Sequence, residues 1–403
     1  MQEKRWKVCA VTGTRAEYGI LRRILCKLRD DDELDLQLAV TGTHLSAKFG
    51  NTQMEIQNDG FDEYDRIPIP VENDDRTGMA VATGVAVEAF ARYFAGKRPD
   101  ILLVLGDRYE AFAAVTAAYI LGVPTAHISG GDVTEGALDD GFRHCITKMS
   151  VLHFPGCQES ADRLVQMGEQ PASVWNVGEP GVENCLATEF WPVERLSEDL
   201  GFPLREKGYA VVTFHPVTQE HGREVAEVDA LIAAMEAVPE LSYIITAANA
   251  DAGGTAINER WQMAAVNHED WHLTASLGVV RYLSACKHAA MVIGNSSSGL
   301  VEIPALGVPT VNIGDRQKGR MLATSVLSCE PTRAAIEAAV RRAMSEDFQA
   351  IARQSDTPFG KGQTSSEIHR ILKAYLASGP HDSRKPFYDL PELSSWLAKE
   401  RRT

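Results

Sequence analysis

Hydrophobic residues gather along this chain in short runs that end in small or polar turn residues. The runs expected to be strands are Lys7–Thr12, Leu36–Thr41, Ile101–Leu105, Tyr209–Phe214, Tyr243–Ala247 and Ala289–Ile293. Helical periodicity follows such runs, and this alternation is typical of doubly wound parallel sheets. The pattern therefore predicts an α/β protein.

An internal echo divides the pattern into two halves. Leu121–Ile128 (LGVPTAHI) and Leu306–Ile313 (LGVPTVNI) are near copies, and each follows a strand, a turn of glycine and a polar residue, and an apolar helix. We infer two Rossmann-like domains that join near Glu183–Glu206, with the ligand in the cleft between them. The expected bounds are 1–190, 205–377 and, for a polar tail that ends in a short helix, 378–403.

Composition narrows the range of partners. The chain has 403 residues and a formal net charge of −15, which argues against a broad surface for nucleic acid or for an anionic membrane. Any phosphate must then be bound by local donors such as helix N-termini and a few arginines. Seven cysteines without a CxxC pair, and no targeting or membrane segment at the N-terminus, favour a reduced, cytoplasmic protein.

The densest chemistry lies in the polar segment Gly130–His144. It carries four carboxylates, an arginine and a histidine: Asp132, Glu135, Asp139, Asp140, Arg143 and His144. Crowded carboxylates favour proton transfer or metal binding, although Asp and Gly also form ordinary loops and helix caps. A second polar turn, Gly106–Arg108 with Asp107, follows a buried strand, where α/β sheets place their ligands. The two segments together predict a reaction centre.

Other turns offer donors for an anion. Arg15 lies at the mouth of a helix after the first strand, and Ser296, Ser297 and Gly299 occupy the turn before another helix. Glu302, about one turn into that helix, is placed to accept ribose hydroxyls. His215 and Arg316 also follow strands directly. The alternatives are an ordinary turn, a serine-rich helix cap and surface side chains.

Metal and nucleotide-cofactor motifs are missing from the sequence. Neither His44 nor His127 stands at metal-ligand spacing from another histidine or carboxylate, and no GxGxxG or P-loop is present. We therefore expect neither a metal nor a cofactor.

Several ordered motifs resemble those of the hydrolysing UDP-N-acetylglucosamine 2-epimerases. They are VTGTRAEYG (11–19), TGTHLSAKFG (41–50), LGDRYEA (105–111), GGDVTEGALDDGFRHCITK (130–148), GNSSSGLVEIPALGVPT (294–310) and NIGDRQKGR (312–320). The resemblance covers nearly the whole chain. It implies a GT-B fold and the conversion of UDP-N-acetylglucosamine and water to N-acetylmannosamine and UDP, by elimination to a 2-acetamidoglucal and rehydration.

The resemblance also implies roles for residues. Asp107 and Asp132 match acid/base positions, with Asp139 or Asp140 close to C2 or to the attacking water, and which carboxylate removes the proton stays open. Arg143 and His144 organise the carboxylate loop or touch the sugar, as members of a catalytic set that includes Glu135. The positions that match the UDP-sugar site are Arg15, His44, His215, Ser296, Ser297, Gly299, Glu302 and Arg316.

Other functions remain open. Related enzymes act on UDP- or GDP-linked 2,4-diacetamido-2,4,6-trideoxyglucose in pathways to legionaminic-type acids, and the same fold serves GT-B glycosyltransferases. A non-catalytic nucleotide-sugar sensor is disfavoured, because a binding protein gains nothing from crowded like charges. The family tends toward homodimers or homotetramers, which is the expectation here.

Overall fold

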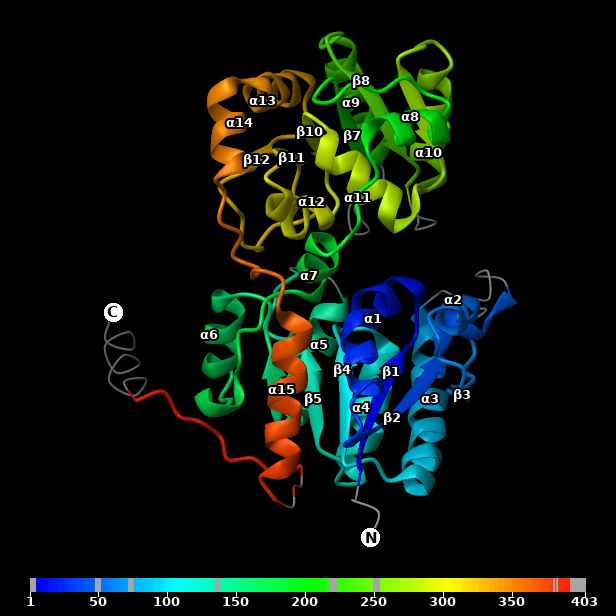
Figure 1. Cartoon of the computed structure of the whole chain (residues 1–403), viewed down its shortest axis with the longest axis vertical. Coiled ribbons are helices and arrows are strands. Elements are labelled where there is room, and N and C mark those ends of the chain that lie inside the picture. The colour runs from blue at the N-terminus through cyan, green and yellow to red at the C-terminus, as the bar shows by residue number, and fades with distance from the viewer. Residues whose placement is uncertain are drawn as a thin grey trace. The chain divides into compact units, whose positions relative to one another are not determined.

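The chain folds into two compact units (Figure 1). The structure, a computed structural model, describes residues 5–47, 52–71, 76–134, 138–216, 223–248, 254–379, 381 and 383–391. Unit 1 comprises residues 1–180 and 362–403, and unit 2 comprises residues 181–361.

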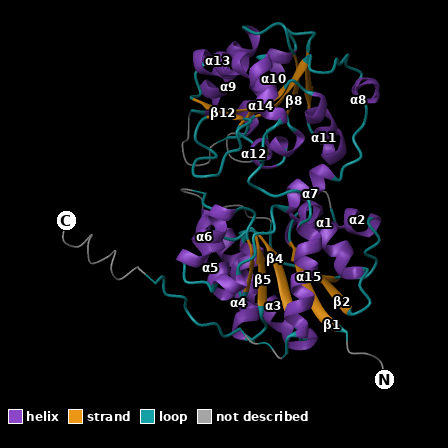
Figure 2. Ribbon diagram, turned by 60° about the vertical axis from the view of Figure 1, so that its left-hand side comes forward, coloured by secondary structure: helices purple, strands orange, loops and turns teal. Residues whose placement is uncertain are grey.

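Unit 1 is built on a parallel sheet in the order β3-β2-β1-β4-β5-β6, with helices on both of its faces (Figure 2). Its elements are β1 (Trp6–Thr12), α1 (Arg15–Arg29), β2 (Leu34–Thr41), the 3-10 helix η1 (Gly42–Leu45), α2 (Gln53–Asn58), β3 (Asp65–Ile67), α3 (Arg76–Lys97), β4 (Ile101–Leu105), α4 (Tyr109–Ile120), β5 (Thr125–Ile128), α5 (Leu138–Met149), β6 (Leu152–Phe154), α6 (Gln158–Gln166), the 3-10 helix η3 (Pro171–Ser173) and α15 (Thr364–Ala377).

The run Val8–Val11 of β1 and the whole of β4 are apolar because both faces of the sheet are covered there. Successive side chains of a strand point to opposite faces. Val8 and Ala10 of β1 pack in one core with α1 and α15, whereas Cys9 and Val11 pack in another with α3 and α4. An unbroken hydrophobic run is the expected sequence of such a buried parallel strand.

Unit 2 repeats this topology with the strand order β12-β11-β10-β7-β8-β9. Its elements are α7 (Pro180–Leu186), α8 (Val193–Leu200), β7 (Tyr209–Thr213), α9 (Glu224–Glu236), β8 (Ser242–Thr246), α10 (Gly254–Ala265), β9 (Trp271–Thr274), α11 (Gly278–His288), β10 (Met291–Gly294), α12 (Ser298–Val301), the 3-10 helix η4 (Ile303–Leu306), β11 (Thr310–Ile313), β12 (Val326–Cys329), α13 (Arg333–Met344) and α14 (Glu346–Arg353). The two echoed octapeptides contain β5 and β11, the fifth strand of each unit. The predicted α/β fold with two doubly wound parallel sheets is confirmed.

Helix α15 packs in unit 1, although it follows unit 2 in the sequence (Figure 1). Its apolar side chains Ile368, Leu372 and Leu376 recur every four residues and are buried in the core that α1 shares. The sequence-based bounds place 364–377 in the second domain, because helical periodicity does not say which core a helix covers. The short helix expected at the end of the tail lies outside the described residues.

No helix in the described ranges is long and apolar enough to cross a bilayer.

Candidate functional site

Each sheet has one point at which its strand order reverses, and polar side chains gather there. In unit 1 the reversal lies between β1 and β4, and in unit 2 between β7 and β10. Open α/β sheets bind ligands outside the carboxyl ends of the strands at such points. The turns that follow these four strands contain Arg15, Asp107, His215 and Asn295.

The turn after β4 holds Asp107 in a fixed position. Gly106 has φ +71°, a left-handed conformation that glycine adopts without strain. Its N–H donates to the carbonyl of Ile128 at 3.0 Å, and its own carbonyl lies 2.7 Å from Nε2 of the buried His127. Two contacts from the neighbouring strand β5 therefore fix the backbone that precedes the Asp107 carboxylate.

Arg143 gathers the predicted catalytic residues around one buried guanidinium. It donates to the carboxylate of Asp107, to the carbonyl of Asp132 at 3.0 Å and to Oδ1 of Asp140 at 3.2 Å. The Arg143 side chain is 5% exposed, against 23% for Asp107 and 24% for Asp140. One shielded positive charge thus permits two carboxylates to stand close together, and it aligns groups from β4, β5 and α5.

The Asp132 carboxylate accepts a hydrogen bond from a residue that the sequence did not predict for the site. Ser160, buried on α6, donates its hydroxyl to Oδ1 of Asp132 at 2.6 Å. Gly131 makes this approach possible, because its φ is +85° and a Cβ there would lie 2.3 Å from the carbonyl oxygen of Ser160. The Sγ atom of Cys157 lies 3.2 Å from the Ser160 hydroxyl. The double glycine before Asp132 is the one sequence signal for this contact.

Helix α5 carries Asp139 and Asp140 in its first turn and His144 one turn later. Asp140 accepts the N–H of Thr134 through Oδ1 at 2.8 Å, and its Oδ2 lies 3.5 Å from Nε2 of His144. Desolvation by the surrounding protein, followed by the charge of Asp107, raises the pKa of Asp139. Asp139 is therefore the carboxyl of this turn best suited to hold a proton. The seventh catalytic candidate, Glu135, lies outside the described residues.

The turn after β1 differs in part from its sequence interpretation. Arg15 opens α1, and its Nε lies 2.7 Å from Oε1 of Glu55, with both side chains substantially exposed. His44 is fully buried, and its two ring nitrogens lie 3.1 and 2.8 Å from the hydroxyls of Thr12 and Thr52. Burial lowers the pKa of His44 to about 4. In this structure His44 therefore connects β1 to the start of α2.

Two buried carboxylates at this edge were not singled out from the sequence. Glu17 accepts the N–H of Gly13 at 2.6 Å, and burial raises the pKa of its carboxyl to about 7. Glu110, 1% exposed, forms two contacts with the Arg108 guanidinium, at 2.9 and 3.1 Å. Glu17 ends the motif GTRAE, and Glu110 ends the motif GDRYE. Helical periodicity places both residues on helix faces, so it does not mark them as site residues.

Asn295 ties together the corresponding turns of unit 2. Its side-chain amide exchanges two hydrogen bonds of 2.8 Å with the backbone of His215. The backbone carbonyl of Asn295 accepts from the Arg316 guanidinium at 3.0 Å and from the side-chain amide of Gln317 at 2.9 Å. Gly294, which precedes Asn295, has φ +139°, and a Cβ there would lie 1.9 Å from the carbonyl oxygen of Thr213. Asn295 thus brings His215 and Arg316 together. It is not among the site residues predicted from the sequence.

The serine turn leads into a shorter helix than the sequence suggested. We expected a helix that continues through Glu302, but α12 ends at Val301 and the 3-10 helix η4 follows. Pro304 explains the change, because it lacks the N–H that would continue the α-helix. Ser296 is half-buried, Ser297 is exposed, and Gly299 packs against Thr310.

The Glu302 carboxylate, expected to accept ribose hydroxyls, is buried in unit 2. Burial raises the pKa of its carboxyl, and its Oε2 atom is buried without a hydrogen-bond partner in the part of the chain that the structure describes. Gly181 lies beside it, because a Cβ there would be 2.5 Å from Oε1. A buried acceptor with spare capacity suits a hydroxyl donor such as a ribose.

The described residues contain no group of three or more His, Cys, Asp or Glu side chains arranged to hold a metal ion.

Two doubly wound units with polar side chains at both switch points define an α/β protein with ligand sites at those points. The chain matches the UDP-N-acetylglucosamine 2-epimerase family over residues 26–373 and belongs to that family.

Relatives of known name agree with this assignment. The chain is 36% identical to polysialic acid biosynthesis protein P7 of Escherichia coli, over 96% of this chain and 99% of that protein. It is 37% identical to the GDP/UDP-N,N'-diacetylbacillosamine 2-epimerase (hydrolyzing) of Campylobacter jejuni, over 80% and 84%. The crystal structure of UDP-GlcNAc 2-epimerase from Neisseria meningitidis bound to UDP-GlcNAc has the same fold, with TM-score 0.79, 17% identity, and coverage of 91% of this chain and 100% of that one.

Proposed function

We propose that this protein is a hydrolysing 2-epimerase that converts UDP-N-acetylglucosamine and water to N-acetylmannosamine and UDP. The observation that carries the proposal is the set of carboxylates that Arg143 gathers, Asp107 and Asp140 by their side chains and Asp132 by its carbonyl. A reaction that removes a proton from one face of a carbon and returns another to the opposite face is served by an acid/base group on each side, and carboxyl groups can fill both roles.

The proposed reaction has two balanced steps. In the first, a carboxylate takes the C2 proton, the C1–C2 double bond forms, and the C1–O bond breaks so that UDP leaves with that electron pair. In the second, the oxygen of water bonds to C1 and water passes one proton to a carboxylate, while a protonated carboxyl delivers a proton to C2 on the opposite face, which inverts that centre. We assign proton transfer to Asp107 and Asp132. Asp139 or Asp140 acts near C2 or the water, and Arg143 and His144 align the loop.

Departure of UDP requires a place for its negative charge, and unit 2 offers donors for it. We assign His215, Ser296, Ser297 and Arg316 to the phosphates, with Gly299 allowing close approach, and Glu302 to the ribose hydroxyls. Arg15 of unit 1 is an exposed guanidinium and is assigned to the diphosphate. Fixed donors placed on a leaving anion lower the barrier to its departure. His44 supports the turn near Arg15 rather than contacting the ligand directly.

The names of the relatives favour a second candidate substrate, a diacetamido-trideoxy sugar nucleotide. Proteins named as hydrolysing diacetylbacillosamine 2-epimerases, from Campylobacter jejuni and Legionella pneumophila, are 37% and 33% identical to this chain, whereas the UDP-N-acetylglucosamine 2-epimerase of Neisseria meningitidis is 27% identical. UDP- or GDP-linked 2,4-diacetamido-2,4,6-trideoxyglucose is therefore the alternative substrate. A glycosyltransferase function is less favoured, because transfer to an acceptor requires one base rather than several carboxylates.

Release of UDP without an acceptor tests the proposal. The purified protein is incubated with UDP-N-acetylglucosamine or with the UDP- or GDP-diacetamido sugar, and the free sugar and nucleotide are separated and identified. We expect one mole of free 2-epimerised sugar for each mole of nucleoside diphosphate. Intact epimerised UDP-sugar would contradict hydrolysis, and a requirement for a sugar acceptor would support the transferase.

The cellular setting follows from the same proposal. We propose that the enzyme works in the cytoplasm as a homodimer or homotetramer. Sedimentation velocity at several protein concentrations measures the oligomeric state.

A further inference from the structure

Within unit 1, the C-terminal segment 383–391 contacts the end of α5 and the residues that follow α6. The N–H of Tyr388 donates to the carbonyl of Gly168 at 2.9 Å. The Phe387 ring covers Gly168 so closely that a Cβ there would lie 2.3 Å from it. The ammonium group of Lys148 lies 4.9 Å from the centre of the same ring. These contacts hold the Phe387 ring and the backbone of Tyr388 against unit 1.

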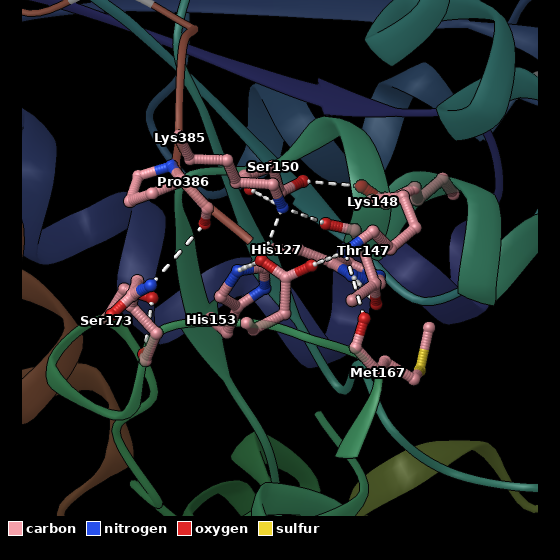
Figure 3. Close-up of polar contacts among 12 residues, drawn as sticks. His127, Thr147, Lys148, Ser150, His153, Met167, Ser173, Lys385 and Pro386 are labelled. Atoms are coloured by element: carbon pink, nitrogen blue, oxygen red, sulfur yellow. Dashed lines mark hydrogen bonds and ion pairs between the residues drawn. The ribbon is translucent and has the colours of Figure 1, made fainter. Parts of the chain in front are cut away.

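Lys385, just before this ring, sends its amino group into the interior of unit 1 (Figure 3). Its Nζ donates to the carbonyl of Thr147 at 2.9 Å and to that of Ser150 at 2.6 Å, and it contacts the carboxylate of Glu169. The Lys385 side chain is 19% exposed and Glu169 is 0% exposed. A shielded ammonium with three oxygen partners is a specific anchor rather than a surface ion pair.

The Lys385 ammonium group binds carbonyls at the C-terminal end of α5. The last carbonyls of a helix have no partner within it and carry partial negative charge, so a cation at that end is favourable. Lys385 supplies the cation. Glu169 balances it, and also lies 2.7 Å from Nζ of Lys148 and 3.0 Å from Nε2 of His153. The opposite end of α5 carries the Asp139–His144 group.

Thr147, whose carbonyl accepts from Lys385, is linked through its hydroxyl and His127 to the turn of Asp107. The Thr147 hydroxyl lies 3.2 Å from Nδ1 of His127, and Nε2 of His127 lies 2.7 Å from the carbonyl of Gly106. A carbonyl only accepts, so Nε2 carries the proton and Nδ1 accepts from the hydroxyl. Burial lowers the pKa of His127 to about 3, which keeps the ring neutral.

We propose that Lys385 is a positioning residue for the reaction: it acts through Thr147 and His127 on the turn that presents Asp107. This inference rests on the proposed function, because it assumes that Asp107 takes part in the chemistry. The segment 383–391 then belongs to the working enzyme, although it follows α15 at the edge of unit 1.

Lys385→Met in the full-length protein tests the inference, since it keeps the apolar stem and removes the charge and the donors. Lys373→Met is the matched control, because Lys373 also bridges two carboxylates of unit 1, those of Asp31 and Glu33. We expect kcat of Lys385→Met to fall by about tenfold or more, with KM and UDP affinity within about twofold of the parent. The control keeps parental values.

Two further readouts separate positioning from general weakening. Hydrogen exchange of the 101–112 peptide, which contains the Gly106 N–H, is expected to quicken in Lys385→Met while β7 of unit 2 is unchanged. Thr147→Val cuts the link to His127 and leaves the carbonyl. The losses in kcat of the double variant are therefore expected to be less than additive.

Unchanged kcat or unchanged exchange at 101–112 in Lys385→Met overturns the inference, as does full additivity with Thr147→Val. The exchange measurement needs no substrate. If the parent protein turns over no nucleotide sugar, the proposed function fails, and the exchange result still decides whether Lys385 positions the turn.

Discussion

The buried carboxyl of Glu17 makes the stability of unit 1 depend on pH in a predictable direction. Burial raises the pKa of Glu17 from 4.5 to about 7 in the folded protein. Between these values the unfolded chain has lost the proton that the folded chain keeps. Glu17 therefore contributes stability that is fully present below pH 4.5 and is lost as pH rises through about 7. Glu17→Gln, neutral at every pH and still able to accept from Gly13, removes this dependence.

The magnitude follows from the two pKa values. Their difference, at about 1.4 kcal/mol for each unit of pH, corresponds to about 3 kcal/mol in the free energy of unfolding. Between pH 5 and pH 8 we expect the parent to lose about 2–3 kcal/mol relative to Glu17→Gln. His44, whose pKa burial lowers to about 4, contributes with the opposite sign. Both proteins contain His44, so its effect cancels in the comparison.

Urea unfolding at a series of pH values measures the effect. Protection of the buried Val8–Val11 strand from hydrogen exchange reports unit 1 alone. Glu63→Gln, which changes an exposed carboxyl of the same unit, is the control and is expected to follow the parent. Equal pH dependence in the parent and Glu17→Gln would refute the reasoning, and so would a parent that gains stability relative to the variant as pH rises.

Three predictions concern the site itself. Asp107→Asn and Asp132→Asn are each expected to abolish turnover with little change in UDP affinity, because the phosphates are assigned to other residues; calorimetry with UDP checks this, and parallel loss of binding would move both residues into the nucleotide site. Arg15→Ala is expected to weaken UDP binding by about tenfold or more, the effect of one lost charged hydrogen bond, and an unchanged dissociation constant would remove Arg15 from that role. Ser160→Ala is expected to lower kcat by about tenfold through loss of the donor to Asp132, whereas Ser160→Thr, which restores a hydroxyl, recovers part of it; equal rates in parent and Ser160→Ala would show that the contact is dispensable.

Much of the fold can be predicted from short stretches of the sequence. Buried parallel strands require apolar side chains on both faces, so the run Ile101–Leu105 identifies β4 by itself. The assignment of α15 to unit 1 depends instead on which core its apolar face meets, and that is a long-range property. The end of α12 at Val301 is local in origin, because Pro304 cannot continue the helix, although the apolar periodicity runs on through it.

The candidate site divides in the same way. Asp107 and Asp132 are predictable because they lie in turns after strands, and Asp140 because it lies in the polar segment 130–144; the structure brings all three around Arg143. Ser160 lies on a helix face and reaches Asp132 only because Gly131 allows the close approach. Such contacts join segments distant in sequence, and no local spacing encodes them.

The most direct test of the central claim is proton NMR of the reaction in D2O with UDP-N-acetylglucosamine and, separately, with the diacetamido-trideoxy analogue. The account predicts a free 2-epimerised sugar that carries deuterium at C2, formed together with the nucleoside diphosphate. Retention of the original C2 proton in the released sugar, or no turnover of either nucleotide sugar, would contradict it.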